Sequence, residues 1–166
     1  SAESTLKSIT VINAETNELL QNIKMPPELN VIYKDIFTKG KPENGFKDKI
    51  LDLVDFNFDN YGDLRILKSW PINLSSKGYY VYIFHSIDNV YVLNDAISAL
   101  PNPIPHSKTS RIESAVLGKW AGGEFTKTFY SIDQSGALTA QSRWIQSIKD
   151  PVRMSFMRDI RLRMDG

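Results

Sequence analysis

Residues 78–84 read Gly78-Tyr79-Tyr80-Val81-Tyr82-Ile83-Phe84, a run of aromatic and β-branched side chains without a polar break. Such side chains fit the pleated surface of a sheet, and this run carries them on both of its faces. A strand with one face in water would alternate apolar and polar residues instead. The stretch therefore predicts a central strand of a sheet, buried on both faces.

Shorter β-prone segments lie on both sides of this run, separated by turns rich in glycine, proline, asparagine or aspartate. Strands are expected at 5–12, 18–25, 50–54, 64–67, 111–117, 125–132, 137–148 and 152–164, with a hairpin turn at Gln134-Ser135-Gly136. Residues 91–100 fit a short strand or a helical turn, and 39–49 fit an exposed loop. The pattern predicts one mainly β domain over residues 1–166, with antiparallel sheets or a meander in a sandwich- or propeller-like arrangement and little helix.

Composition excludes several classes of function. The chain has 20 Lys plus Arg and 19 Asp plus Glu, so its net charge of +1 argues against a nucleic-acid partner. It contains no cysteine, which excludes disulfides, thiolate catalysis and cysteine-based zinc sites. No apolar run approaches the roughly 18 residues of a transmembrane helix. The polar start Ser1-Ala2-Glu3-Ser4 would fit a mature form that has lost an export signal or a lipidated residue.

Residues 55–63 read Asp55-Phe56-Asn57-Phe58-Asp59-Asn60-Tyr61-Gly62-Asp63 and place oxygen-bearing side chains at alternate positions. Calcium prefers about six to eight oxygen ligands, which a tightly curling loop can gather around one centre. Asn60 stands at the sharp turn, where asparagine tolerates the left-handed conformation. The pattern predicts a calcium loop between two strands, with ligands from Asp55, Asn57, Asp59, the main-chain carbonyl of Tyr61, and Asp63.

This loop differs from an EF-hand at its twelfth position, where Ile66 replaces the bidentate glutamate. The expected calcium affinity is therefore weak, on the order of 10⁻⁴ to 10⁻³ M. The loop's three carboxylates would repel one another without a cation, so the ion should be needed for local order. The alternative is a turn in which aspartate and asparagine bind the backbone and no metal.

Catalytic motifs are missing from the sequence. His85 and His106 stand outside metal-binding spacings such as H-E-x-x-H, and no serine lies in a G-x-S-x-G elbow. The glycine-rich stretch 118–123 lacks the residue order of a phosphate-binding loop. Glu113 and Glu124 would serve as an acid/base pair only if the fold brought them together. We therefore expect a binding protein and not an enzyme.

Residues 55–65 also carry a resemblance to a known family. They are similar to the D-x-N-F-D-G-Y-x-D-L-R loop of bacterial periplasmic lipoproteins related to the periplasmic inhibitor of i-type lysozyme, with Asn60 in place of glycine. Some of these lipoproteins are immunity proteins against secreted cell-wall hydrolases. The resemblance covers roughly residues 8–148, with weaker support from 20–23, 78–84 and 100–103.

The resemblance implies where a partner would bind. Inhibitors of this family insert a loop with serine and glycine, followed by an aromatic residue, into the cleft of the target. Residues 114–125 occupy the similar place, but Ala121 and Phe125 depart from the family's Ser-Gly-x-Tyr pattern, so a lysozyme target is not implied. The alternative is a tight β-turn with its aromatic residues in the core. The implied partner-binding residues are Ser114, Lys119, Trp120, Gly122, Gly123, Glu124, Phe125 and Tyr130.

Together these observations predict an exported, periplasmic, calcium-binding immunity protein or inhibitor that blocks a secreted toxin in competition between bacteria. The expected toxin is a peptidoglycan hydrolase, and the full-length form is expected to be a lipoprotein. The alternative is a calcium-structured module that binds cell-wall glycan or another surface ligand. Neither function requires a nucleic-acid partner or a transmembrane segment.

Overall fold

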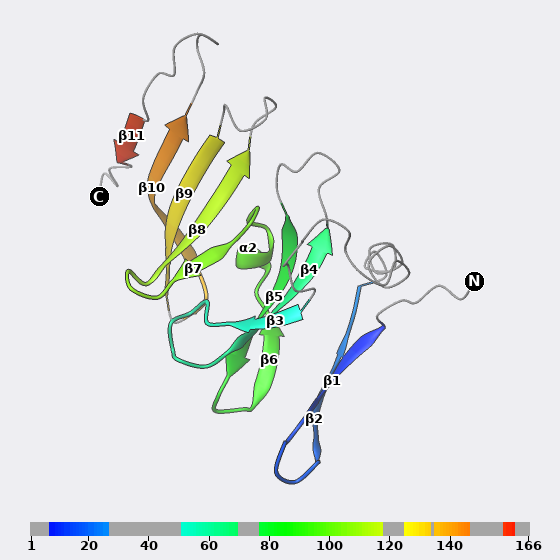
Figure 1. The fold of residues 1–166 in the computed structure, drawn as a ribbon. Helices are drawn as coiled ribbons and strands as arrows, with labels where there is room; N and C mark the ends of the chain where they lie inside the picture. Colours follow the sequence, from blue (N-terminus) through cyan, green and yellow to red (C-terminus); the bar gives the residue numbers. More distant parts are fainter. Residues whose placement is uncertain are drawn as a thin grey trace, which may run out of the picture.

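The computed structural model describes residues 7–26, 51–69, 77–117, 125–133, 135–146 and 158–161 (Figure 1). Within these ranges the chain forms three antiparallel sheets and one short helix, which confirms the expected mainly β fold. The expectation of an exposed loop at 39–49 lies outside the described residues. The elements are β1 (Ser8–Ile12), β2 (Leu19–Lys24), β3 (Leu51–Val54), β4 (Asp63–Ser69), β5 (Gly78–His85), β6 (Val90–Leu93), α2 (Asp95–Ser98), β7 (Ile104–His106), β8 (Arg111–Leu117), β9 (Phe125–Ile132), β10 (Leu138–Gln146) and β11 (Arg158–Arg161).

The four-stranded sheet has the order β3-β4-β5-β6, so β5 is an interior strand. Its residues from Tyr79 to Ile83 are all buried, which confirms the prediction made from the aromatic run. Edge strand β3 is held to β4 by a bidentate ion pair in which Arg65 donates to both carboxylate oxygens of Asp52, at 2.9 and 2.7 Å. This pair fixes the strand that leads into the acidic loop.

The N-terminal hairpin β1–β2 covers one face of this sheet. Its apolar side chains Ile9, Val11, Ile23 and Met25 pack against Leu64, Ile66, Tyr80 and Tyr82. The side-chain amide of Gln21 also binds the backbone of Tyr91 on edge strand β6, donating to its carbonyl at 2.9 Å and accepting from its N–H at 2.7 Å. The side chain of Gln21 therefore binds the N–H and C=O groups of Tyr91, as the backbone of a neighbouring strand would.

The opposite face of the four-stranded sheet packs on the five-stranded sheet, whose order is β11-β10-β9-β8-β7. Figure 1 shows α2 lying between these two sheets. Full burial of one large apolar side chain contributes about 1.5–3 kcal/mol, so this core dominates the stability of the region. Its buried members are Phe56, Leu67, Tyr79, Val81, Ile83, Ile97 and Ile112.

For residues 91–100 the sequence was compatible with a short strand or a helical turn, and the structure contains one of each. Strand β6 ends at Leu93, and α2 begins after Asn94, whose side-chain oxygen accepts a hydrogen bond from the Ile97 N–H at 2.9 Å. This is the usual N-cap contact of asparagine, and it satisfies one N–H of the first turn. Burial of the Ile97 side chain in the core between the sheets stabilises the helix in this position.

Candidate metal-binding loop and adjoining pocket

The acidic loop connects β3 to β4, whose pairing ends with Val54 opposite Asp63. The expected connection between two strands is therefore present. Phe56, the second residue of the loop, has no exposed surface and packs in the core between the two larger sheets. One end of the loop is consequently fixed by the apolar core and the other by strand β4.

Two residues of the loop adopt the left-handed backbone conformation. Asn60 has φ of 70°, which confirms the prediction that asparagine replaces glycine at the sharp turn. Phe58 has φ of 62°. A bulky residue is rarely found there, and nothing in the spacing of the sequence indicated it. The packing of the Phe58 ring against the core offsets the cost of this conformation.

The polar side chains of the loop curl inward onto its backbone. Asp55 accepts hydrogen bonds from the N–H groups of Asp59 and Asn60, at 3.2 and 3.0 Å. Asp59 accepts from the Tyr61 N–H at 2.8 Å and from the Asn57 side-chain amide at 2.8 Å. Such local bonds are typical of turns rich in aspartate and asparagine. They hold the loop closed, with Asp55, Asn57 and Asp59 on the same arc.

Asp63 differs from the other acidic residues because its side chain has no exposed surface. Its two carboxylate oxygens accept hydrogen bonds from the N–H groups of Phe56, at 2.7 Å, and Phe84, at 2.9 Å. Burial raises the pKa of this carboxyl to about 6, although the two amide bonds lower it and the nearby charge of Asp59 raises it further. At neutral pH Asp63 is therefore a buried negative charge that fastens the loop to β5.

The residues of the loop suit a calcium ion in their chemistry. All of the polar side chains supply oxygen, and a carboxylate oxygen that accepts one N–H bond keeps a lone pair for a cation. The buried charge of Asp63 would also be offset by a cation in the loop. Among the described residues no three carboxylate or imidazole groups converge as a metal-binding group. The ion would therefore also need the amide oxygen of Asn57 and the carbonyl of Tyr61, and the calcium site stays a prediction.

Replacing Asp59 by alanine is expected to remove the stabilisation that calcium gives to the wild-type chain. With the affinity expected above, about 10 mM calcium would raise the free energy of unfolding by about 1.4–2.7 kcal/mol. The measurement is urea unfolding of wild type and Asp59→Ala in calcium and in EDTA. The matched control is Asp88→Ala, which removes a nearby carboxylate outside the expected ligand set. A calcium effect that is the same in all three chains would contradict a site in this loop.

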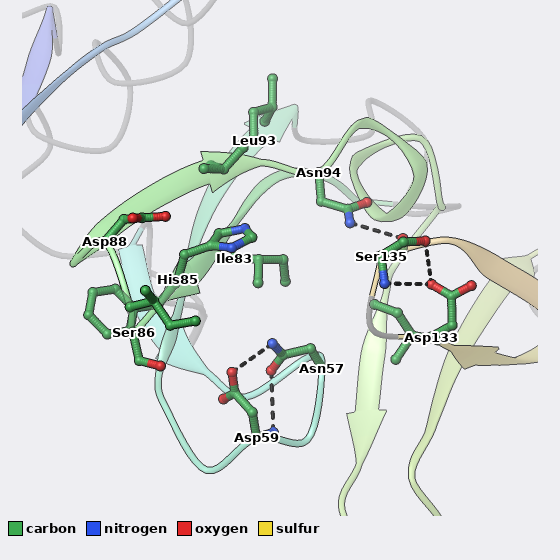
Figure 2. A pocket seen from close by; sticks show the side chains of 15 residues that line it. Asn57, Asp59, Ile83, His85, Ser86, Asp88, Leu93, Asn94, Asp133 and Ser135 are labelled. Atoms are coloured by element: carbon green, nitrogen blue, oxygen red, sulfur yellow. Dashed lines mark hydrogen bonds between the residues drawn. The ribbon is translucent and has the colours of Figure 1, made fainter.

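A pocket of about 530 Å³ adjoins the acidic loop (Figure 2). Three segments that are distant in the sequence form its walls: the acidic loop, the β5–β6 hairpin and the β9–β10 turn. The expected turn before β10 is present, with the Gly136 N–H bound to the Asp133 carbonyl at 3.0 Å. The lining residues are Asn57, Asp59, Ile83, Phe84, His85, Ser86, Ile87, Asp88, Val92, Leu93, Asn94, Ile132, Asp133, Ser135 and Gly136.

The residues expected to bind a partner are only partly described. Lys119, Trp120, Gly122, Gly123 and Glu124 lie outside the described residues. The three described members are Ser114, Phe125 and Tyr130. Ser114 is buried on β8, and its hydroxyl donates to the Pro101 carbonyl at 2.8 Å. Phe125 and Tyr130 are five residues apart on strand β9, so their side chains point to opposite faces of the sheet.

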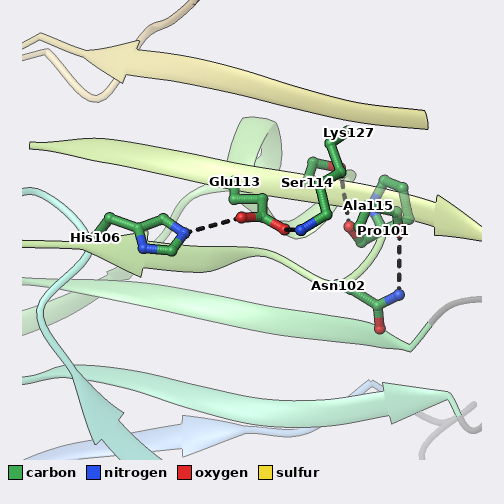
Figure 3. A network of polar contacts seen from close by, with 7 residues as sticks. All are labelled: Pro101, Asn102, His106, Glu113, Ser114, Ala115 and Lys127. Atoms are coloured by element: carbon green, nitrogen blue, oxygen red, sulfur yellow. Dashed lines mark hydrogen bonds and ion pairs between the residues drawn. The ribbon is translucent and has the colours of Figure 1, made fainter. Parts of the chain in front are cut away.

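A charged network lies on the outer face of the five-stranded sheet (Figure 3). Glu113 on β8 contacts Nε2 of His106 on β7 at 3.0 Å and Nζ of Lys127 on β9 at 2.8 Å. His106 therefore has a partner, and Glu113 is engaged by two basic groups. The rings of Phe129 and Trp144 continue this face, with centroids 6.4 Å apart and planes at 68°. This cluster could not be predicted from the sequence, because its members come from four strands.

Comparisons with known proteins give one informative match. No family model matches the chain, and no curated protein matches it. Within the described ranges, no helix has the length and apolar character needed to cross a membrane. A solved structure described as that of a Xanthomonas type IV secretion system related protein superimposes with a TM-score of 0.55 and 15% sequence identity. The match covers 71% of this chain and 61% of that chain, and it establishes a similar fold.

Proposed function

We propose that this chain is an exported calcium-binding immunity protein or inhibitor, with no catalytic activity of its own, that binds a secreted bacterial toxin and blocks it. The proposed target is a peptidoglycan hydrolase. The proposed place of action is the periplasm, with a lipid anchor in the full-length protein. The observation that carries the proposal is the β8–β9 hairpin at the centre of the five-stranded sheet.

The two strands of this hairpin pair without interruption from Ile112 opposite Tyr130 to Leu117 opposite Phe125. Strands β7 and β10 flank them on both sides. Strands that are held on both sides give the segment that joins them a fixed base, so less conformational entropy is lost from the strands when a partner binds. The segment 118–124 joins the two strands at this end and includes Trp120, a residue type enriched among strong interface anchors. We propose that this segment enters the cleft of the target.

The bacterial context is supported by two observations. The similar Xanthomonas chain is described as related to a type IV secretion system, although that similarity concerns the fold. The acidic loop at 55–65 resembles that of periplasmic inhibitors, and a weak calcium loop suits a compartment outside the cytosol, where calcium is abundant. A cell that secretes a cell-wall hydrolase needs a protein that neutralises this hydrolase in its own periplasm.

The test uses the full chain and the cell-wall hydrolases encoded beside its gene. Wild type is expected to form a stoichiometric complex and to stop the clearing of a peptidoglycan suspension. Trp120→Ala is expected to weaken the complex at least about 30-fold, because anchoring tryptophans often contribute about 2 kcal/mol or more. Calorimetric titration measures the affinity. The matched control Trp144→Ala removes the same ring from the outer face of the same sheet.

The control variant Trp144→Ala also distinguishes the proposed inhibitor from the second candidate function, which is a glycan-binding module. A glycan-binding module is favoured by the outer sheet face, where Phe129 and Trp144 offer ring surfaces beside the Glu113 network. Binding of purified peptidoglycan fragments that Trp144→Ala abolishes and Trp120→Ala preserves would establish the module. The inhibitor proposal would be overturned if the wild-type chain inhibited no hydrolase encoded beside its gene and if Trp120→Ala left the affinity unchanged.

A further inference from the structure

A short connection between α2 and β7 links the two larger sheets. It reads Pro101-Asn102-Pro103, and because proline has no N–H group, Asn102 supplies its one backbone donor. This N–H donates to the Lys77 carbonyl at 2.8 Å, and the Asn102 side-chain oxygen accepts a hydrogen bond from the Lys77 N–H at 2.6 Å. Lys77 directly precedes β5, so Asn102 binds the start of an interior strand of the four-stranded sheet.

The same connection binds strand β8 of the five-stranded sheet (Figure 3). The Asn102 side-chain nitrogen donates to the Ala115 carbonyl at 3.1 Å. The Pro101 carbonyl accepts hydrogen bonds from the Ala115 N–H at 3.2 Å and from the Ser114 hydroxyl at 2.8 Å. One side-chain amide therefore joins the two sheets, because its oxygen binds the start of β5 and its nitrogen binds β8.

The apolar core between the sheets holds the other end of the five-stranded sheet. Its members from that sheet are Ile112 near the start of β8, Ile132 at the end of β9 and Leu138 at the start of β10. Val116 lies on the same face of β8 as Ile112, but its side chain is 44% exposed. The core therefore does not reach the end of β8 from which segment 118–124 continues. Asn102 binds β8 at Ala115, on the side of Ile112 that is nearer to this segment.

Asparagine meets two requirements at position 102. Asn102 has φ of 46°, in the left-handed region that asparagine tolerates better than most residues with a side chain. Its amide also supplies both an acceptor for the Lys77 N–H and a donor for the Ala115 carbonyl. Glycine would meet only the first requirement. Aspartate would keep the acceptor and lose the donor, so it would remove the bond to β8 alone.

We infer that Asn102 is a positioning residue for the proposed interface, because it fixes the direction in which the β8–β9 hairpin projects from the four-stranded sheet. The inference rests on the proposed function for the role of segment 118–124, and it adds a residue that acts without touching the partner. Ser114, implied above as a partner-binding residue, supports the same contact through the Pro101 carbonyl. A hairpin that samples several directions is competent to dock for only part of the time, and the apparent dissociation constant rises in proportion.

The direction of the hairpin can be measured without a partner. The chain has no cysteine, so Leu53→Cys on β3 and Val116→Cys on β8 provide two specific sites for spin labels, both at exposed side chains. Double electron–electron resonance is expected to give one narrow distribution of distances between the labels when Asn102 is present. Asn102→Asp is expected to broaden this distribution, because it removes the bond to Ala115 and keeps the bond to Lys77.

Asn94→Asp is the matched control, because it removes the same kind of bond at the other end of the five-stranded sheet. The Asn94 side-chain nitrogen donates to the Gly136 carbonyl at 3.1 Å, and aspartate would keep the acceptor for the Ile97 N–H. Ile132 and Leu138 still pack between the sheets beside this turn, so the distance distribution is expected to stay narrow. Asn102→Gly is the second test variant, since it removes the side-chain bonds without adding a charge and tolerates the left-handed backbone.

The affinity for the hydrolase that the wild-type chain binds is measured by calorimetric titration. Asn102→Asp and Asn102→Gly are expected to weaken this complex about three- to tenfold, which corresponds to a docking-competent fraction of about a third to a tenth. Asn94→Asp is expected to bind as tightly as wild type. Urea unfolding of each variant identifies the conditions under which all of the chains are folded, and the titrations are made there.

The inference would be overturned if both Asn102 variants kept the wild-type distance distribution, or if Asn94→Asp broadened it equally. It would also be overturned if Trp120→Ala weakened the complex while both Asn102 variants bound as tightly as wild type, a result that leaves the proposed function standing. A broader distribution in both Asn102 variants, together with no hydrolase bound by wild type, would retain the positioning of the hairpin and reject the proposed target.

Discussion

Replacing Asp63 by alanine is expected to lower the free energy of unfolding by about 2–4 kcal/mol, in EDTA as well as in calcium. The side chain is fully buried, and its two oxygens are the acceptors for the N–H groups of Phe56 and Phe84. Alanine would leave both N–H groups without these acceptors, and a buried donor without a partner costs about 1–3 kcal/mol. Relief from burying a carboxylate offsets part of this loss.

The measurement is urea unfolding followed by tryptophan fluorescence and circular dichroism. Asp63→Asn is the matched control, because it keeps the shape and one acceptor oxygen, and about half of the loss is expected. A loss that appears only in calcium would mean that Asp63 serves as a metal ligand and does not fasten the loop to β5.

Replacing Phe56 by alanine is expected to cost about 3–5 kcal/mol, the range for a fully buried phenylalanine. Its ring has no exposed surface and joins the acidic loop to the core between the sheets. The variant should unfold at lower urea concentration, and the proposed binding of calcium should weaken because the proposed ligands of the loop are no longer held in place. Calorimetric titration with calcium measures this second effect.

Phe58→Ala is the matched control for this prediction, since Phe58 lies in the same loop but is only half-buried. A smaller loss of stability is expected, because less apolar surface is removed from the core. Equal losses for the two phenylalanines would show that the loop is not anchored through Phe56.

The strands could be predicted well where one physical cause dominated. Residues 78–84 have β-prone side chains on both faces, and the structure places them in an interior strand. The bounds expected for β8 and β9 agree with the structure because β-branched and aromatic residues end where turn residues begin. Residues 91–100 could not be decided, because the cap at Asn94 and the burial of Ile97 depend on contacts with other segments.

The candidate site could be predicted only where it is local in the sequence. The acidic loop is continuous, so the sequence indicated its position between two strands and the sharp turn at Asn60, and the structure joins Asp55, Asn57 and Asp59 by hydrogen bonds within it. The pocket joins three turns, and single aspartates such as Asp88 and Asp133 are ordinary turn residues when seen in the sequence alone. Only the packing of the sheets brings these turns around one concavity.

The contact between Gln21 and Tyr91 bears on how the molecule avoids self-association. Strand β6 is an outer strand of its sheet, and free N–H and C=O groups on such strands invite pairing with other chains. At Tyr91 both groups are already bound by the amide of Gln21. A strand of a second chain could pair with β6 at Tyr91 only if the hairpin β1–β2 were displaced. The hairpin therefore opposes edge-to-edge association at this strand, in addition to burying apolar side chains of the sheet.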